Sequence, residues 1–102
     1  MKKSLDDFIK SSPLPVFVDF WADWCGPCKM VGPAVKQLAE EFKGRLVVVK
    51  VNVDQQPEAA ACFQVQGIPA LMLFNKGELK WRTAGALSYP QLKAEVTKAL
   101  AL

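Results

Sequence analysis

Runs of apolar residues along the chain predict four strands. Three nearly continuous runs are rich in β-branched and aromatic residues, which is typical of strands covered on both faces, and they occupy residues 16–20, 46–53 and 70–74. Residues 78–83 instead alternate between apolar and polar side chains, as a strand with one solvated face does. Turn residues at 75–77 separate the last two runs, so we expect these two strands to form an antiparallel hairpin.

Apolar residues at helical spacing predict four helices around these strands. The longest stripe is followed by a stop at Gly44 and consists of Met30, Val31, Ala34, Val35, Leu38 and Phe42. The other helices are expected over 4–10, over 57–63 and from about 89 to the C-terminus. The resulting order predicts an α/β fold in which a mixed sheet of about four strands lies between two helix layers, within one domain spanning 1–102.

Capping residues mark where three of these helices begin. Ser4 is a good N-cap for the first helix and Asp54 for the third, where Pro57 follows in the first turn. Ser88 and Gln91 have the spacing of a capping box before the last helix.

Composition and charge narrow the class of protein. The chain is 51% hydrophobic and 23% charged, an ordinary globular composition, and its lysines are scattered although the formal net charge is +3. Nucleic-acid binding would need a clustered basic face, so we do not expect it. No apolar run reaches membrane-spanning length, and three cysteines without histidine do not form the even framework of a secreted stapled domain. These features predict a cytoplasmic protein that does not bind membranes.

Cys25 and Cys28 lie where a predicted strand gives way to a predicted helix. Cys25 should sit near the first free backbone N–H groups of that helix, which stabilise a thiolate and lower its pKa. The two intervening residues should bring the sulfurs within bonding distance and leave the first exposed and the second tucked into the helix. Gly26 allows a tight turn there, and Pro27 suits an early helical position. The pair suits disulfide exchange, in which Cys25 attacks a foreign disulfide and Cys28 resolves the mixed disulfide.

A metal site is the alternative interpretation of the cysteine pair. A closed zinc site needs four cysteine or histidine ligands, and this chain offers only Cys62 besides the pair. We therefore expect no metal site within the chain, although a cluster bridged between two chains would satisfy the ligand count. Cys62 itself follows a run of alanines and is expected to be a small buried hydrophobe, with an exposed regulatory thiol as the alternative.

Asp19 is a second candidate for chemistry because it interrupts a buried strand. Val18 and Phe20 should project to one face of that strand, and Phe17 and Asp19 to the other. A carboxyl group buried in this way has a raised pKa, which is frequent in proton-transfer groups. The alternative is an acid that simply faces water.

The segment 18–30, which reads VDFWADWCGPCKM, resembles the active-site segment of the thioredoxin family. The resemblance implies the thioredoxin fold and a thiol–disulfide oxidoreductase that reduces protein disulfides without a bound cofactor and receives electrons from a thioredoxin reductase. Gly26 and Pro27 between the cysteines resemble the reducing members of the family, whereas isomerases and oxidants commonly carry histidine there. The alternatives to a reductase are an oxidase, an isomerase, or a permanent subunit that is used only for docking.

The resemblance also implies roles for individual residues. Asp19 would shuttle the proton of Cys28, and Lys50 on the neighbouring strand would tune Asp19 unless it merely extends into water. The Ile68–Pro69 bond is expected to be cis and opposite the disulfide, although cis bonds are a small minority overall. The expected substrate-docking surface is shallow and apolar, with Trp21 packed beneath the site, and it consists of Trp24, Gly26, Pro27, Gly67, Ile68, Gly85 and Ala86.

One departure from the family concerns the sheet edge. Thioredoxins usually open with an extra strand, and too few residues precede Val18 here to build it. Strand 46–53 would then be an edge with unpaired backbone groups. We expect the N-terminal segment or a second molecule to cover it, which gives a monomer or a weak dimer. The pattern predicts no role for Trp81 or Arg82.

Overall fold

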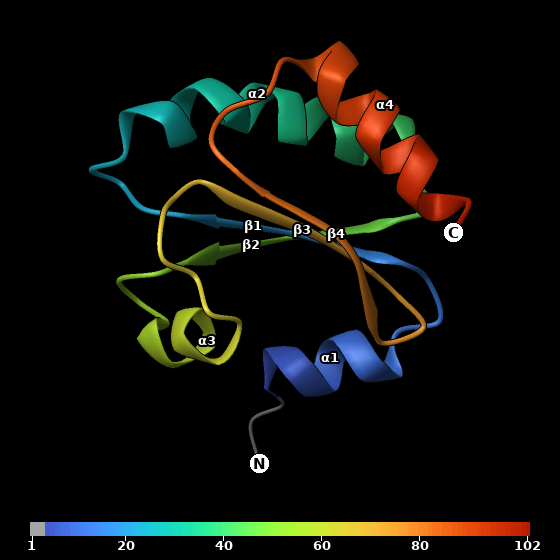
Figure 1. Ribbon diagram of the computed structural model, residues 1–102, viewed down its shortest axis with the longest axis horizontal. Helices are drawn as coiled ribbons and strands as arrows, with labels where there is room; N and C mark the ends of the chain where they lie inside the picture. Colours follow the sequence, from blue (N-terminus) through green and yellow to red (C-terminus); the bar gives the residue numbers. More distant parts are fainter. Residues whose placement is uncertain (1–3) are drawn as a thin grey trace.

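The computed structural model describes residues 4–102 and confirms the expected order of elements (Figure 1). Those residues form α1 (Leu5–Ser11), β1 (Val16–Trp21), α2 (Gly26–Glu41), β2 (Val47–Asn52), α3 (Pro57–Cys62), β3 (Ala70–Asn75), β4 (Glu78–Ala84) and α4 (Tyr89–Leu100). None of the described helices is both long enough and apolar enough to cross a membrane.

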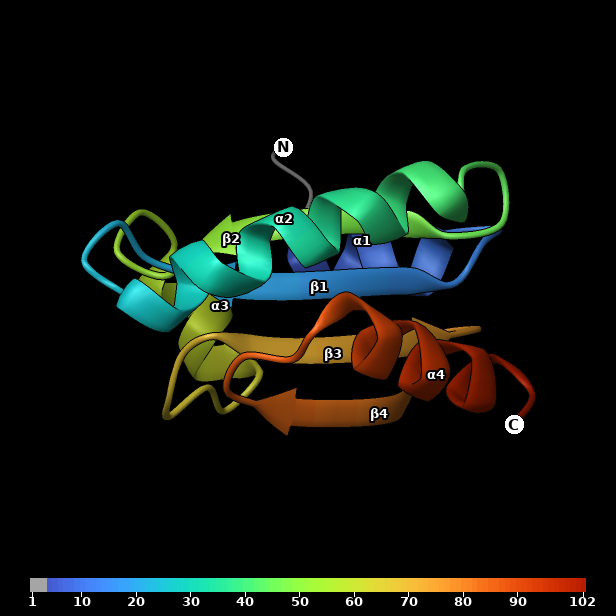
Figure 2. The ribbon, with the colours of Figure 1, turned by 90° about the horizontal axis from the view of Figure 1, so that it is seen from above.

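The four strands form one mixed sheet in the order β2-β1-β3-β4. β1 runs parallel to β2, whereas the pairs β1–β3 and β3–β4 are antiparallel. Lys76 and Gly77 join β3 to β4 with positive φ angles of 55° and 80°, as a two-residue hairpin turn requires. Helices α2 and α4 cover one face of the sheet, and α1 and α3 cover the other (Figures 1 and 2). The predicted sheet between two helix layers is therefore confirmed.

The predicted helix starts are confirmed at two places and wrong at a third. The Ser4 hydroxyl accepts a hydrogen bond from the Asp7 N–H at 3.1 Å, and Ser88 and Gln91 form the expected capping box. Asp54, however, does not cap α3, whose N-cap is Gln56 without a side-chain bond. The buried Asn52 at the end of β2 instead stabilises the turn before α3, because its Oδ1 accepts hydrogen bonds from the N–H groups of both Asp54 and Gln55.

Two apolar clusters fill the two sides of the sheet. Phe17 contributes to the cluster beneath α2 and α4, whereas Val16, Val18 and Phe20 contribute to the cluster over α1 and α3. Met30 was expected on the buried stripe of α2, but it is 75% exposed. Val31, the next residue, faces the core, and neighbouring helical residues point about 100° apart, so Met30 faces solvent.

β2 is an edge strand, as predicted. Its inner side bonds to the β1 segment, for example through the Val47 N–H to the Pro15 carbonyl at 2.9 Å. Among residues 4–102 no strand pairs with its outer side. We expect the start of the chain or a second molecule to cover this edge. Part of that start, residues 1–3, lies outside the described residues.

Candidate active site

The junction between β1 and α2 brings Cys25 and Cys28 together. They form a disulfide with Cα atoms 5.3 Å apart, within the ordinary range for such bonds. Cys25 is the N-cap of α2, and its Sγ accepts a hydrogen bond from the Cys28 N–H at 3.1 Å. The first sulfur therefore lies against the free backbone donors of the helix, as the sequence predicts.

The prediction that Cys25 would be exposed is wrong for this disulfide form. Cys25 is 4% exposed and Cys28 is 5% exposed. Both pack with Ala22 in a small apolar cluster that Trp21 and Ile68 cover in part. The N-cap geometry turns the Cys25 sulfur toward the helix, which is why it is nearly as buried as its partner.

Asp19 is buried in the middle of β1, on the side of the sheet that α2 covers. Its side chain lines a cavity of about 210 Å³ together with Trp21, Ala22, Asp23, Cys28, Lys29, Gly32 and Lys50. Within residues 4–102 its Oδ1 has no hydrogen-bond partner. Burial raises the pKa of Asp19 from its ordinary 3.8 to about 6, and the nearby Lys50 charge opposes that rise. The expectation of a buried acid at this position is confirmed.

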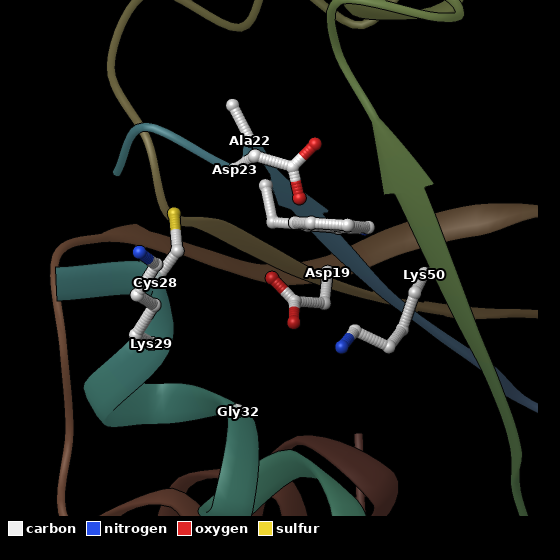
Figure 3. Close-up of a pocket in the computed structure, with 8 residues that line it drawn as sticks. Asp19, Ala22, Asp23, Cys28, Lys29, Gly32 and Lys50 are labelled. Atoms are coloured by element: carbon white, nitrogen blue, oxygen red, sulfur yellow. The ribbon is translucent and has the colours of Figure 1, made fainter. Parts of the chain in front are cut away.

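Lys50 lies directly across from Asp19 in the parallel pair of β1 and β2. In Figure 3 the Asp19 carboxyl group lies between the Cys28 side chain and the Lys50 ammonium group. The Lys50 Nζ also lies 5.0 Å from the centre of the Trp21 ring, a cation–π contact. Trp21 packs beneath the cysteines as expected, and its Nε1 has no hydrogen-bond partner in the described part of the chain.

The loop before β3 brings Ile68, another predicted residue, to the cysteines. The Ile68–Pro69 peptide bond is cis, as expected, and Ile68 packs against the cysteine cluster. The Gly85 N–H donates to the Pro69 carbonyl at 2.9 Å, which brings the end of β4 beside this loop. Trp24 is 69% exposed; Gly26, Pro27, Gly67 and Ala86 are also exposed, while Ile68 and Gly85 are half-buried.

Trp24 has a partner that the sequence pattern did not indicate. Its Nε1 donates a hydrogen bond of 2.8 Å to Oδ2 of Asp54, in the loop after β2. This bond joins residues 30 positions apart and holds an exposed indole beside the disulfide. No local pattern could have predicted it, since the two loops meet only when β1 and β2 pair.

Comparison with known proteins decides the family. The thioredoxin family model matches residues 1–98. The chain belongs to the thioredoxin family. It is 75% identical over 100 residues to thioredoxin 1 of Chlorobaculum tepidum, covering 98% of this chain and 99% of that protein. It is also 49% identical over 88 residues to the thioredoxin of Acidithiobacillus ferridurans, covering 86% and 81% of the two chains.

A plant relative extends the comparison. The chloroplastic M-type thioredoxin of Spinacia oleracea is 39% identical over 97 residues, which cover 95% of this chain and 54% of that protein. Thioredoxins are protein-disulfide oxidoreductases, so this protein is a thiol–disulfide oxidoreductase with Cys25 and Cys28 as its redox pair.

The third cysteine of the chain lies apart from the redox pair. Cys62 is exposed, so the prediction of a buried thiol is wrong. The six-residue α3 buries none of its own residues, and it lies on the opposite face of the sheet from α2 (Figure 1). Residues 4–102 contain no group of three or more histidine, cysteine or acidic side chains placed to hold a metal ion.

Proposed function

We propose that this thioredoxin-family protein reduces disulfides in other proteins. The supporting observation is the Cys25–Cys28 pair at the start of α2, where the Cys28 N–H points at the Cys25 sulfur. In the reduced protein the same donor would stabilise a Cys25 thiolate. That thiolate attacks one sulfur of the substrate disulfide, forms a mixed disulfide and releases the other sulfur as a thiolate.

Cys28 then completes the exchange. Its thiolate attacks the Cys25 sulfur of the mixed disulfide, which forms the Cys25–Cys28 bond and releases the second substrate thiolate. Two electrons have passed to the substrate. Asp19 is the proposed acceptor for the Cys28 proton, because both side chains line the same cavity and the carboxyl group has a pKa of about 6. Lys50 is proposed to tune Asp19 from the facing strand.

The docking surface is proposed to consist of the exposed residues around the cysteines. Trp24 presents an apolar ring, and Gly67, Ala86, Gly26 and Pro27 are exposed without bulky side chains. Ile68 packs on the cysteine cluster, so an extended substrate segment beside its backbone would bring a disulfide close to Cys25. Gly85 borders the same loop. Such a shallow surface suits brief contact with many partners.

Trapping the mixed disulfide tests this order of events. A Cys28→Ser variant should accumulate a covalent adduct with a disulfide-containing protein such as insulin, because the resolving thiol is missing. Cys25→Ser should form no adduct, and Cys62→Ser, the matched control on the far side of the sheet, should turn over normally. Equal adduct formation by Cys25→Ser and Cys28→Ser would contradict the assignment of Cys25 as the attacking residue.

Thioredoxin reductase is the proposed electron source, and the cytoplasm the proposed location. Gly26 and Pro27 between the cysteines favour a reductant, which would pass electrons from the reductase to protein disulfides and so keep cellular thiols reduced. An oxidase or isomerase is the competing function. Turnover with NADPH and a bacterial thioredoxin reductase should oxidise NADPH in step with insulin reduction, whereas a lack of coupling would count against this electron source.

The protein is proposed to be a monomer or a weak dimer. The half-buried valines of β2, and its outer side to which no strand pairs among residues 4–102, favour association through residues 46–53. Lys50 is exposed at the centre of that strand, and a symmetric pairing would bring two such charges together, so the dimer should be weak. Sedimentation velocity over a range of concentrations checks this; a stable dimer at micromolar concentration would contradict it.

A further inference from the structure

Arg82 lies on β4, outside the redox site, and bonds with both ends of its guanidinium group to a single turn. Its Nη1 donates to the Phe63 carbonyl and its Nη2 to the Gln64 carbonyl, each at 3.3 Å. The two acceptors are consecutive, so the planar fork of arginine fits them together. A lysine, with one nitrogen, could not span both in this way.

The turn that Arg82 holds ends α3. The Val65 N–H donates to the Ala60 carbonyl at 2.9 Å and the Gln64 N–H to the Ala61 carbonyl at 3.1 Å, which is the Schellman pattern of a helix C-terminus. Gln64 occupies its left-handed position with φ of 55°, where glycine is the usual residue. The Gln64 conformation is therefore unfavourable by itself, and a guanidinium bonded to the Phe63 and Gln64 carbonyls favours it.

The chain then runs from this turn directly to the substrate-facing loop. Residues 66–68 make no backbone hydrogen bond of their own to the rest of the described chain, and the next tie is the Gly85 N–H to the Pro69 carbonyl. Arg82 lies near the end of β4, and Gly85 is the residue that follows this strand. The loop carrying Gly67 and Ile68 is thus held at its two ends by one short segment.

We propose that Arg82 is a positioning residue that fixes the loop carrying Ile68 relative to the Cys25–Cys28 pair and thereby sets the affinity for protein disulfides. This inference rests on the proposed function, since it assumes that substrates dock beside Ile68. Arg82 touches none of the reacting atoms. Its loss should leave the chemistry of the cysteines unchanged while it weakens binding of substrates large enough to use the loop.

Steady-state kinetics of Arg82→Gln with two substrates test the proposal. With insulin, KM should rise about threefold to tenfold while kcat stays within about twofold, as expected for loss of a charged hydrogen-bonding group that acts on binding. With a small aromatic disulfide such as 5,5′-dithiobis(2-nitrobenzoate), which does not need the loop, the rate should be unchanged. Arg82→Lys should recover part of the insulin KM, because it keeps the charge and can reach one carbonyl.

A matched variant controls for the lost charge. Lys80→Gln removes a cation from the same strand, where Lys80 pairs with the exposed Glu78, and it should keep the wild-type KM. An equal KM for Arg82→Gln and the wild type would overturn the proposal, and so would equal losses with the small disulfide and insulin. Failure of the wild type to reduce insulin would instead contradict the proposed function itself, so the two failures are distinguishable.

Discussion

The two faces of β1 differ in what they contribute to the molecule. Toward α1 and α3 the strand presents Val16, Val18 and Phe20, each at most 1% exposed and surrounded by apolar residues. Toward α2 and α4 it presents Phe17 and then Asp19, whose carboxyl group is equally buried and has an oxygen without a partner in residues 4–102. One face contributes packing alone, whereas the other gives up packing near the cysteines for an ionisable group.

The difference can be expressed as a free energy. A rise in the pKa of Asp19 from 3.8 to about 6 corresponds to about 3 kcal/mol of destabilisation at neutral pH, because the folded state resists ionising a group that the unfolded chain ionises freely. That amount is similar to the loss expected from truncating a large core side chain. The fold therefore tolerates this penalty at one strand position, beside the redox pair.

Replacing Asp19 should have the largest effect on stability. Asp19→Asn should raise the free energy of unfolding by about 3 kcal/mol at pH 7, because the buried charge is removed. Because the pKa of Asp19 is higher in the folded state, the destabilisation is absent at pH values below the pKa of the unfolded chain. It grows as the pH rises from about 4 to about 6 and is constant above pH 6. Urea unfolding of variant and wild type at pH 4 and pH 7 checks this sign.

Asp23→Asn is the matched control for that series. Asp23 lines the same cavity but is exposed, so its replacement should leave the difference between pH 4 and pH 7 unchanged. A stability gain for Asp19→Asn that is equal at both pH values would contradict the assignment of the gain to ionisation.

The same Asp19→Asn variant should resolve mixed disulfides more slowly. General-base catalysis contributes about 10²-fold or more in many enzymes, but a thiol already ionises in part near neutral pH, so we expect a loss of about tenfold. Single-turnover release of the second substrate thiol measures this step. A resolving rate equal to that of the wild type would remove Asp19 from the proposed mechanism.

The apolar face of β1 should respond in the opposite way. Val18→Ala should lower the free energy of unfolding by about 2 kcal/mol at every pH, through lost apolar burial and the cavity left behind. Its reduction rate per folded molecule should match the wild type, because Val18 faces away from the cysteines. Urea unfolding and insulin reduction under native conditions test both statements; a pH-dependent loss would break the distinction between the faces.

Lys50 should produce the smallest effect. Lys50→Gln removes the charge that opposes the burial of Asp19, so the pKa of Asp19 should rise further. Because Lys50 is exposed, its interaction is worth less than about 1 kcal/mol and the rise should be a fraction of a pKa unit. Carbon-13 NMR titration of the Asp19 carboxyl group measures it, and a fall in the pKa would show that Lys50 acts in another way.

Sequence alone predicted the parts of the fold that depend on local periodicity. The continuous apolar run of β1, typical of a strand covered on both faces, correctly placed Asp19 in the interior, and the β1-to-α2 junction correctly placed Cys25 at a helix start. Arrangements between distant segments were missed. The Trp24–Asp54 bond and the Arg82 contacts with α3 both join loops or strands that meet only in the assembled sheet.

The wrong predictions of burial have a similar origin. Met30 and Cys62 are apolar residues on helices, and composition favours the interior for both. Whether such a residue is buried depends on which way its helix faces and on how much of that helix touches the sheet. Met30 lies outside the buried face of α2, and the short α3 buries none of its residues.

The equilibrium reduction potential of the Cys25–Cys28 pair, measured against glutathione in a Cys62→Ser background, tests the central claim most directly. A reductant of protein disulfides should have a potential more negative than the cytosolic glutathione poise found by biochemical extraction, about −220 to −260 mV. A potential near or above that poise would contradict the account and assign the protein to the oxidases or isomerases, despite Gly26 and Pro27 between its cysteines.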